Sequence, residues 1–171
     1  MSTRNFPESS VSDMGIKKDY QKEEKNMEEI KVSVVIPVYN VEEFLNNTLS
    51  DITGQTLKEI EIICVDDGST DNSCKIIEEW MEKDSRIQLI RQKNQYAGVA
   101  RNNGLKQAHG KYVIFWDADD LFDSNALEVM YTQAEQEHSD ICICEARKYD
   151  NAKVIIMWLR SSIFIPISFL V

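Results

Sequence analysis

Short apolar runs alternate with stretches of helical periodicity from Lys31 onward. A β-branched run that ends in a polar turn predicts a buried strand, whereas apolar residues three and four positions apart predict one face of a helix. The predicted strands span residues 32–36, 60–65, 87–90, 112–116 and 141–144. The helical faces between them comprise Phe44, Leu45, Thr48, Leu49 and Ile52; Ile76, Ile77, Trp80 and Met81; residues 97–108; and Leu127, Met130, Tyr131 and Ala134.

This alternation predicts an α/β fold with a mostly parallel sheet, covered by helices on both faces. In such sheets, ligands bind outside the carboxyl ends of the strands. Three predicted strand ends carry polar residues there: Tyr39-Asn40, Asp66-Asp67 and Asp117-Ala118-Asp119. Their convergence on one sheet edge predicts a binding site.

The two ends of the chain differ from this pattern. Residues 1–30 are polar and of mixed charge, without the apolar centre of a signal peptide, and are predicted to be a flexible leader. Residues 151–171 form an apolar tail whose only charged residues are Lys153 and Arg160. Residues 154–171 within this tail hold one charged residue, Arg160, and their length of 18 residues is borderline for a membrane span, which needs roughly 20 apolar residues. Three interpretations stay open: a core strand and loop, a membrane-seeking tail, or the end of a truncated reading frame.

Composition narrows the candidate functions. A chain of 171 residues fits one domain, and its net charge of −10 disfavours nucleic-acid binding. An acidic protein can still bind a nucleotide if a metal ion or backbone N–H groups offset the phosphates. Four cysteines without a CxxC pair and only two histidines argue against a zinc site. Free thiols predict a cytoplasmic location.

Asp117 and Asp119 are the candidate metal ligands. Carboxylates one residue apart after a buried strand can meet one hard cation, and Mg²⁺ and Mn²⁺ prefer oxygen ligands. A diphosphate would be repelled by the bare carboxylates, so a phosphate site here requires the metal. The alternative is an acidic turn in which Asp120 or Asp123 caps the next helix.

The other polar loops also allow two interpretations each. Asp66 or Asp67 can accept a hydrogen bond from a ribose hydroxyl or a base N–H, or the turn can cap the next helix. Tyr39 can stack on a base or simply occupy a strand–helix junction. Arg101 can contact a phosphate or lie exposed on its helix. Dinucleotide, P-loop and nucleophile-elbow motifs are absent from the sequence.

Four segments together resemble the family 2 glycosyltransferases, in the order in which that family carries them. They are Val-Ser-Val-Val-Ile-Pro-Val-Tyr-Asn (32–40), Ile-Cys-Val-Asp-Asp-Gly-Ser-Thr-Asp-Asn-Ser (63–73), Ala-Gly-Val-Ala-Arg-Asn-Asn-Gly-Leu (97–105) and Val-Ile-Phe-Trp-Asp-Ala-Asp-Asp (113–120). Gln55-Thr56 also fits, and the likeness covers about residues 31–149. It places a nucleotide-sugar-binding domain at residues 31–150.

The resemblance implies a GT-A fold, a Rossmann-like three-layer sandwich that binds a nucleotide-diphospho-sugar, often a UDP-sugar, with Mn²⁺ or Mg²⁺. It also implies inverting transfer of a hexose to an acceptor hydroxyl in glycan or polysaccharide synthesis. The nucleotide-sugar-binding residues it implies are Pro37, Tyr39, Glu42, Asp66, Asp67, Arg101 and Asp117. Asp67 would bind the base, and Asp117 and Asp119 would form the metal-binding DxD pair, with Asp119 favoured as the direct ligand.

The family's general base is a carboxylate well downstream of the DxD pair. Here only Glu145 and Asp150 follow Asp140 as carboxylates, neither in a recognisable motif, and the family pattern stops after Asn151. The catalytic base is therefore unknown, and the acceptor-binding half is expected to be missing. Two hypotheses follow: an active glycosyltransferase, and a donor-binding remnant without turnover. Membrane association through the tail is a further expectation.

A third hypothesis is a phosphotransferase of the haloacid dehalogenase type, because Asp117-Ala118-Asp119 follows a hydrophobic strand. That family has Thr or Val two residues after the second aspartate, where this chain has Leu121. The hypothesis also leaves Tyr39 and Asp67 unexplained, so it is the weakest of the three.

Overall fold

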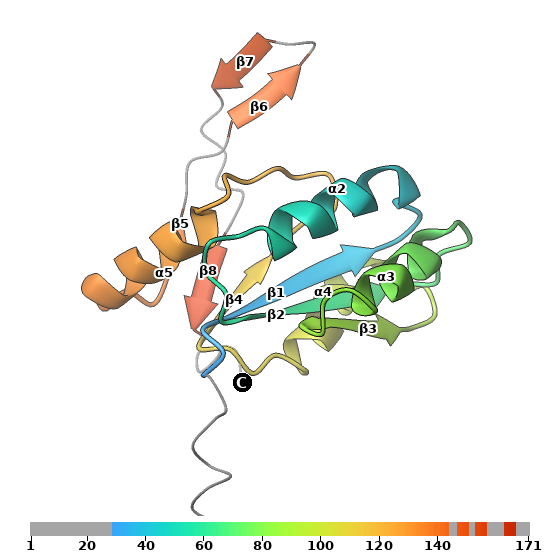
Figure 1. The fold of residues 1–171 in the computed structure, drawn as a ribbon, viewed down its shortest axis with the longest axis horizontal. Helices are drawn as coiled ribbons and strands as arrows, with labels where there is room; N and C mark the ends of the chain where they lie inside the picture. The colour runs from blue at the N-terminus through green and yellow to red at the C-terminus, as the bar shows by residue number, and fades with distance from the viewer. Residues whose placement is uncertain (1–28, 144–146, 151–152, 157–162, 167–171) are drawn as a thin grey trace, which may run out of the picture.

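A computed structural model of the chain describes residues 29–143, 147–150, 153–156 and 163–166. Its main sheet has the strand order β3-β2-β1-β4-β8-β5, and β6 and β7 pair with each other (Figure 1). The elements are β1 (Val32–Val38), α2 (Glu42–Thr53), β2 (Ile60–Asp66), α3 (Ser73–Met81), β3 (Ile87–Arg91), α4 (Tyr96–Leu105), β4 (Tyr112–Phe115), α5 (Ala126–Gln136), β5 (Cys142–Ile143), β6 (Arg147–Asp150), β7 (Lys153–Ile156) and β8 (Ile163–Pro166).

Strands β3, β2, β1 and β4 are parallel, which confirms the predicted α/β fold with a mostly parallel sheet. Val32 at the start of β1 pairs with Ile60 and with Tyr112, so the three strands begin level with one another. Their carboxyl ends therefore lie at the same edge of the sheet. β8 continues the sheet antiparallel to β4, and β5 pairs antiparallel with β8.

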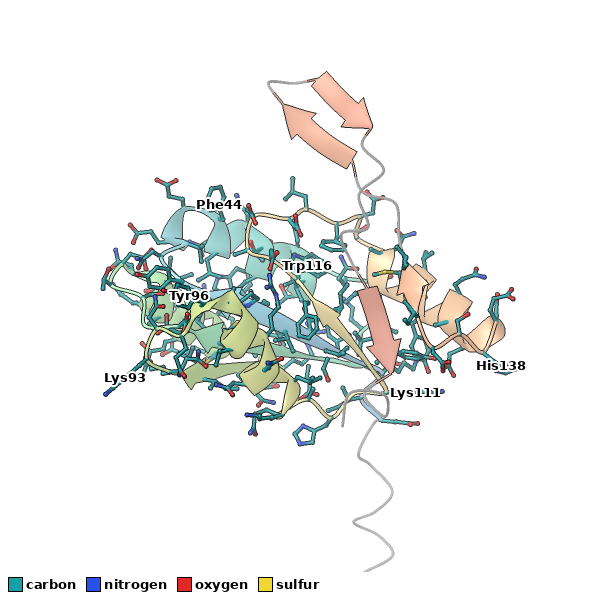
Figure 2. The ribbon with its side chains drawn as sticks, turned by 180° about the vertical axis from the view of Figure 1, so that it is seen from behind. Phe44, Lys93, Tyr96, Lys111, Trp116 and His138 are labelled. Carbon is teal, nitrogen blue, oxygen red and sulfur yellow. The ribbon has the colours of Figure 1, made fainter. Side chains whose placement is uncertain are left out.

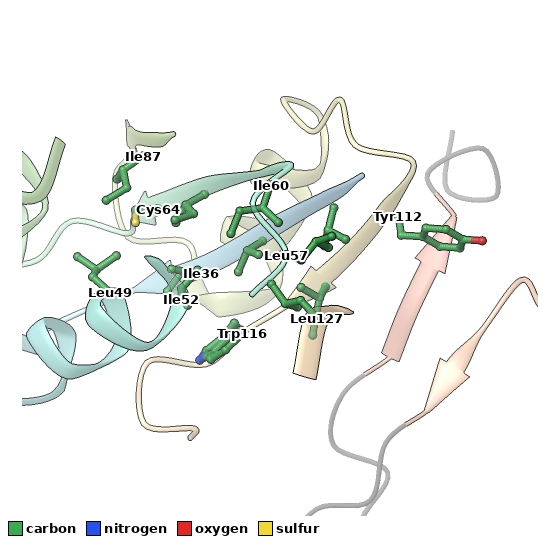
Figure 3. Close-up of a cluster of buried hydrophobic side chains, with 14 of the residues drawn as sticks. Ile36, Leu49, Ile52, Leu57, Ile60, Cys64, Ile87, Tyr112, Trp116 and Leu127 are labelled. Carbon is green, nitrogen blue, oxygen red and sulfur yellow. The ribbon is translucent and has the colours of Figure 1, made fainter. Parts of the chain in front are cut away.

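Helices cover both faces of the sheet because alternate residues of each strand point to opposite sides. Val34 and Ile36 of β1 belong to a large core with Leu45 of α2, Ile77 of α3 and Leu127 of α5. Ile36 and Leu127 are both visible in this core (Figure 3). Each fully buried Val, Leu or Ile stabilises the fold by roughly 1.5–3 kcal/mol.

Within the described residues, α4 is the helix that packs against the opposite face. Val35 of β1 and Val65 of β2 form a smaller core there with Ala100 of α4. A Cβ atom on Gly104 would lie only 2.4 Å from a Val35 methyl carbon. The missing side chain at Gly104 therefore lets α4 approach the sheet closely.

Several predicted details need correction. Phe44 and Met81 were expected on buried helix faces, but they are 48% and 39% exposed. Phe44 lies in the first turn of α2, where it faces a cleft instead of the core. The helix predicted for residues 97–108 ends at Leu105, because the N–H groups of Gln107 and Ala108 turn to carbonyls three residues back.

The ends of the chain are only partly described. Residues 163–166 of the apolar tail form β8, which pairs antiparallel with β4. The fifth predicted strand is reduced to Cys142–Ile143, while Cys144, most of the tail and nearly all of the predicted leader lie outside the described residues. No helix in the described ranges is both long and apolar enough to cross a membrane.

Candidate nucleotide-sugar site

A cleft of about 680 Å³ opens at the carboxyl ends of the parallel strands. Its wall comes from four places in the chain: the end of β1 with the first turn of α2, the end of β2, the start of α4, and the loop after β4. The residues that line it are Pro37, Val38, Tyr39, Val41 and Phe44; Asp67; Asn94, Tyr96, Ala97 and Arg101; and Asp117, Ala118 and Asp119. Phe44 and Tyr96 project from α2 and from the start of α4 (Figure 2).

The loop after β1 is tied to the loop after β2. The N–H of Asn40 donates to Ser69 Oγ at 3.1 Å, and Asn40 Oδ1 accepts from the N–H of Thr70 at 2.8 Å. Asn40 holds a left-handed backbone with φ 52°, a conformation that Asn tolerates better than most residues. These contacts fix the backbone beside Tyr39, whose half-exposed side chain faces the cleft.

Glu42 is engaged in the same connection and does not line the cleft. Its Oε2 accepts hydrogen bonds from the N–H and the side-chain amide of Asn72, each at 2.8 Å. Its own N–H donates to Asp71 Oδ2 at 3.0 Å. Burial would raise the pKa of Asp71, but hydrogen bonds from Ser73 and from the Glu42 N–H outweigh it and lower that pKa. In this structure Glu42 therefore supports the loop beside the cleft and is not one of its lining residues.

The two aspartates at the end of β2 have different surroundings. Asp66 Oδ1 accepts from the N–H of Ser69 at 3.1 Å, and Asp66 does not line the cleft. Asp67 does line it, although only 2% of the residue is exposed. Asp67 Oδ1 accepts from the Gln92 side-chain amide at 2.7 Å and from the N–H of Gln95 at 2.8 Å. Asp67 thus joins the end of β2 to the loop between β3 and α4.

The acidic loop after β4 meets α4 through an ion pair. Arg101 Nη2 lies 2.5 Å from Asp117 Oδ1, with both side chains partly exposed. The carbonyl of Ala118 accepts a hydrogen bond from the hydroxyl of Thr48 on α2 at 2.5 Å. Asp119 is exposed. Burial and the neighbouring charges of Asp117 and Asp119 raise the pKa of Asp120.

A buried glutamine supports the chain beyond this acidic loop. The side-chain amide of Gln55 donates to the carbonyl of Asp123 at 2.9 Å, and its Oε1 accepts from the N–H of Leu127 at 3.1 Å. Trp116, buried just after β4, packs its ring against Phe122 with 3.7 Å between the centroids. The acidic loop is therefore anchored by Trp116 at its start and by Gln55 just beyond its end.

The donor set fits a hard divalent cation. The described part of the chain contains no cluster of three or more Asp, Glu, His or Cys residues arranged to hold a metal. It does place two carboxylates, Asp117 and Asp119, on one wall of the cleft. Mg²⁺ keeps several waters in its shell and is commonly bound through one or two carboxylates together with substrate phosphates. Asp119 makes no hydrogen bond or ion pair with any described residue, so both of its oxygens are open to a ligand.

Several of the cleft residues, including Phe44, Asn94 and Tyr96, are not indicated by the sequence patterns. Phe44 was assigned to a buried helix face, while Asn94 and Tyr96 were not singled out. Tyr96 has a φ of 69°, which no local sequence pattern indicated for a tyrosine. The adjacent Asn94 and Gln95 were the available signal, because such polar residues before a helix are typical of a structured loop.

Comparison with known proteins identifies the class. The solved structures similar to this chain include TarS residues 1–349 of S. aureus in complex with UDP-GlcNAc, with a TM-score of 0.67 and 31% identity over 73% of this chain and 36% of that one. Another is the mannosyltransferase PcManGT of Pyrobaculum calidifontis in complex with GDP-Man and Mn²⁺, with a TM-score of 0.54 and 26% identity over 60% of this chain and 32% of that one. The fold is accordingly the GT-A fold of glycosyltransferases.

The family model for glycosyl transferase family 2 matches residues 33–169, and the chain belongs to this family. Its curated relatives include the cholesterol galactosyltransferase of Borreliella burgdorferi, 46% identical over 111 residues, or 65% of this chain and 31% of that protein. Glycosyltransferase GlyG of Streptococcus pneumoniae is 38% identical over 122 residues, or 71% of this chain and 40% of that protein. The chain thus spans about a third of the length of these relatives.

Proposed function

We propose that residues 31–150 bind a nucleotide-diphospho-sugar, a UDP-sugar in particular, through Mn²⁺ or Mg²⁺. The observation that carries the proposal is that Asp67, Arg101, Asp117 and Asp119 line one cleft, although they come from three separate segments. The match to solved complexes with UDP-GlcNAc and with GDP-Man and Mn²⁺ supports the same ligand class.

Each lining residue has a role that its chemistry allows. Asp119, with Asp117, would hold the metal, which would offset the charge of the diphosphate and stabilise it as a leaving group. Arg101, which pairs with Asp117 in this structure, would contact a phosphate oxygen of the donor when Asp117 serves the metal. Asp67 would accept a hydrogen bond from the base, and Tyr39, beside Pro37, would stack on it.

The proposed reaction is an inverting transfer to an acceptor hydroxyl in glycan or polysaccharide synthesis. The acceptor oxygen forms a bond to the anomeric carbon from the face opposite the diphosphate. The bond from that carbon to the diphosphate oxygen breaks, and its electron pair leaves with the nucleotide. A general base must take the hydroxyl proton.

One observation favours the alternative of donor binding without turnover. The only carboxylates that line the cleft within the described residues are Asp67, Asp117 and Asp119, and each has a role on the donor side. None of them is left to take the proton of the acceptor. Glu145 lies outside the described residues. An assay of UDP release with mixed sugar acceptors separates the two functions: turnover at the rate of a full-length relative contradicts the alternative.

The first prediction concerns Asp119. We expect Asp119→Ala to weaken Mn²⁺-dependent UDP binding by at least about tenfold, since even the partners that orient a metal ligand contribute roughly 10–100-fold to metal affinity. The fold should stay intact because the side chain is exposed. Calorimetry of UDP with and without Mn²⁺ measures the effect.

Asp140→Ala is the matched control for this prediction, because Asp140 is also exposed but lies after α5 and does not line the cleft. It should bind UDP as the parent chain does. If Asp119→Ala binds UDP and Mn²⁺ with parental affinity, the assigned metal site is wrong. If the parent chain shows no metal-dependent UDP binding, the proposed function itself fails.

A further inference from the structure

Three aromatic side chains line the cleft and remain open to solvent. Tyr39 and Phe44 are each 48% exposed, and Tyr96 is 83% exposed. Large aromatic residues usually bury most of their surface, so an aromatic ring left exposed at a concave site is available to a ligand. Tyr96 is the most exposed of the three and has no role in the residue assignments made above.

Core packing does not explain the position of Tyr96. Its φ of 69° lies in the left-handed region, which is a genuine outlier for a bulky residue. Such conformations persist only where the surroundings impose them, and they cluster at ligand-binding sites. The exposed ring of Tyr96 contributes little packing that could offset this strain.

The surrounding hydrogen bonds show what holds the residue in place. Asp67 Oδ1 accepts from the Gln92 side chain and from the Gln95 N–H, immediately before Tyr96. Gln92 Oε1 in turn accepts from the Asn103 side chain of α4 at 2.7 Å. The loop before Tyr96 is therefore tied both to the end of β2 and to α4. This arrangement directs an aromatic ring to the Asp67 end of the cleft.

The two ends of the cleft offer different chemistry. Arg101, which pairs with Asp117, lies five residues beyond Tyr96 on α4, or about 7.5 Å further along the helix axis. The charged groups that suit a metal and a diphosphate therefore lie at the Arg101 end of the cleft, and Tyr96 lies at the other end. A nucleoside diphosphate has the same polarity, with a flat base at one end and phosphates at the other.

We propose that Tyr96 is a further donor-binding residue, whose ring stacks on the nucleobase at the Asp67 end of the cleft. This inference rests on the proposed function and adds a second aromatic contact, from the start of α4, to the one proposed for Tyr39. Stacking on an aromatic ring tolerates different bases, because every base presents a π-face. Tyr96 accordingly contributes affinity for the nucleoside, and Asp67 supplies the hydrogen bond that distinguishes one base from another.

The test compares Tyr96→Asn and Tyr96→Phe with the parent chain. Asn tolerates the left-handed backbone, so Tyr96→Asn removes the ring with little disturbance of the loop. Calorimetry in Mn²⁺ uses UDP as the complete probe and pyrophosphate as the probe without a base. We expect Tyr96→Asn to weaken UDP binding about tenfold, the usual scale of a lost base–aromatic stack. Pyrophosphate binding should not change, and Tyr96→Phe should keep the parental affinity for UDP.

Three results would overturn the inference. Parental UDP affinity in Tyr96→Asn shows that the ring does not contact the nucleoside. Loss of UDP-GlcNAc affinity with unchanged UDP affinity places the ring on the sugar instead. Equal weakening of UDP and pyrophosphate shows a general distortion of the cleft. A parent chain that fails to bind UDP with Mn²⁺ is a separate result, because it removes the proposed function before Tyr96 is tested.

Discussion

At the scale of single residues, Asp67 serves both the framework and the cleft. Its Oδ1 accepts two hydrogen bonds that join β2 to the loop before α4, and the residue still lines the cleft. A carboxylate can accept up to four hydrogen bonds, so this framework role leaves capacity for a ligand. Substitution of Asp67 would therefore change loop geometry and donor contact together, which makes Tyr96 the cleaner position for testing base recognition.

Gln55 provides a prediction at this scale. Gln55→Ala should lower the free energy of unfolding by roughly 1–3 kcal/mol, because it leaves the buried N–H of Leu127 without its partner and also removes the part-buried hydrogen bond to the carbonyl of Asp123. Urea denaturation measures the change. Gln133→Ala on the exposed side of α5 is the control and should have a small effect. Equal losses in both variants would contradict the buried role of Gln55.

The sequence predicts which residue types reach the cleft better than it predicts their contacts. Asp67, Arg101, Asp117 and Asp119 were identified because they follow strands or lie in family motifs, and all four line the cleft. The pairing of Arg101 with Asp117 depends on how closely α4 packs against the sheet. The strained backbone of Tyr96 depends on hydrogen bonds to distant residues. No local sequence pattern indicates either the ion pair or the strained backbone.

At the scale of elements, α4 links the core to the cleft. Its buried residues Ala100 and Gly104 pack against the sheet, while Tyr96, Ala97 and Arg101 line the cleft. The distance between helix and sheet therefore sets the position of the arginine relative to the acidic loop. The strands and helices were predictable because their apolar periods are local. The pairing of β8 with β4 joins residues about 50 positions apart and was not predictable from periodicity.

Two glycines of α4 give a matched pair of variants. Gly104→Ala should lower the free energy of unfolding by about 1–3 kcal/mol, because its Cβ atom would overlap Val35 and overpacking outweighs the gain in helix propensity. Gly98→Ala should raise it by about 0.5–1 kcal/mol, since nothing lies within 4 Å of that Cβ position. Thermal or denaturant unfolding tests both changes. A stabilising effect at Gly104 would contradict the close packing of α4.

At the scale of the whole molecule, several carboxylates make stability depend on pH. Hydrogen bonds from partners lower the pKa of Glu59, Asp84 and Glu135, with Lys31, Arg86 and Lys111 as the respective donors that contribute most. A group whose pKa is lower in the folded chain stabilises that chain above its unfolded pKa. This contribution is lost as the pH falls through the folded value.

The free energy of unfolding should therefore decrease as the pH falls below the ordinary carboxyl range, about 3.8–4.5. Asp84→Asn removes one contributor, so its stability should depend less steeply on pH in this range than that of the parent chain. Urea unfolding at a series of pH values from neutral to acidic measures both slopes. Identical slopes would show that the Asp84–Arg86 pair does not carry the effect.

The position of β8 has a consequence for synthesis of the chain. β4 pairs with β1 on one side and with β8 on the other, and β5 pairs with β8. During translation, β4 and β5 emerge from the ribosome before β8 exists, so the outer edge of β4 has no partner for that interval. Unpaired strand edges invite association with other chains. The nascent domain is thus most prone to aggregate between completion of its four parallel strands and arrival of residues 163–166.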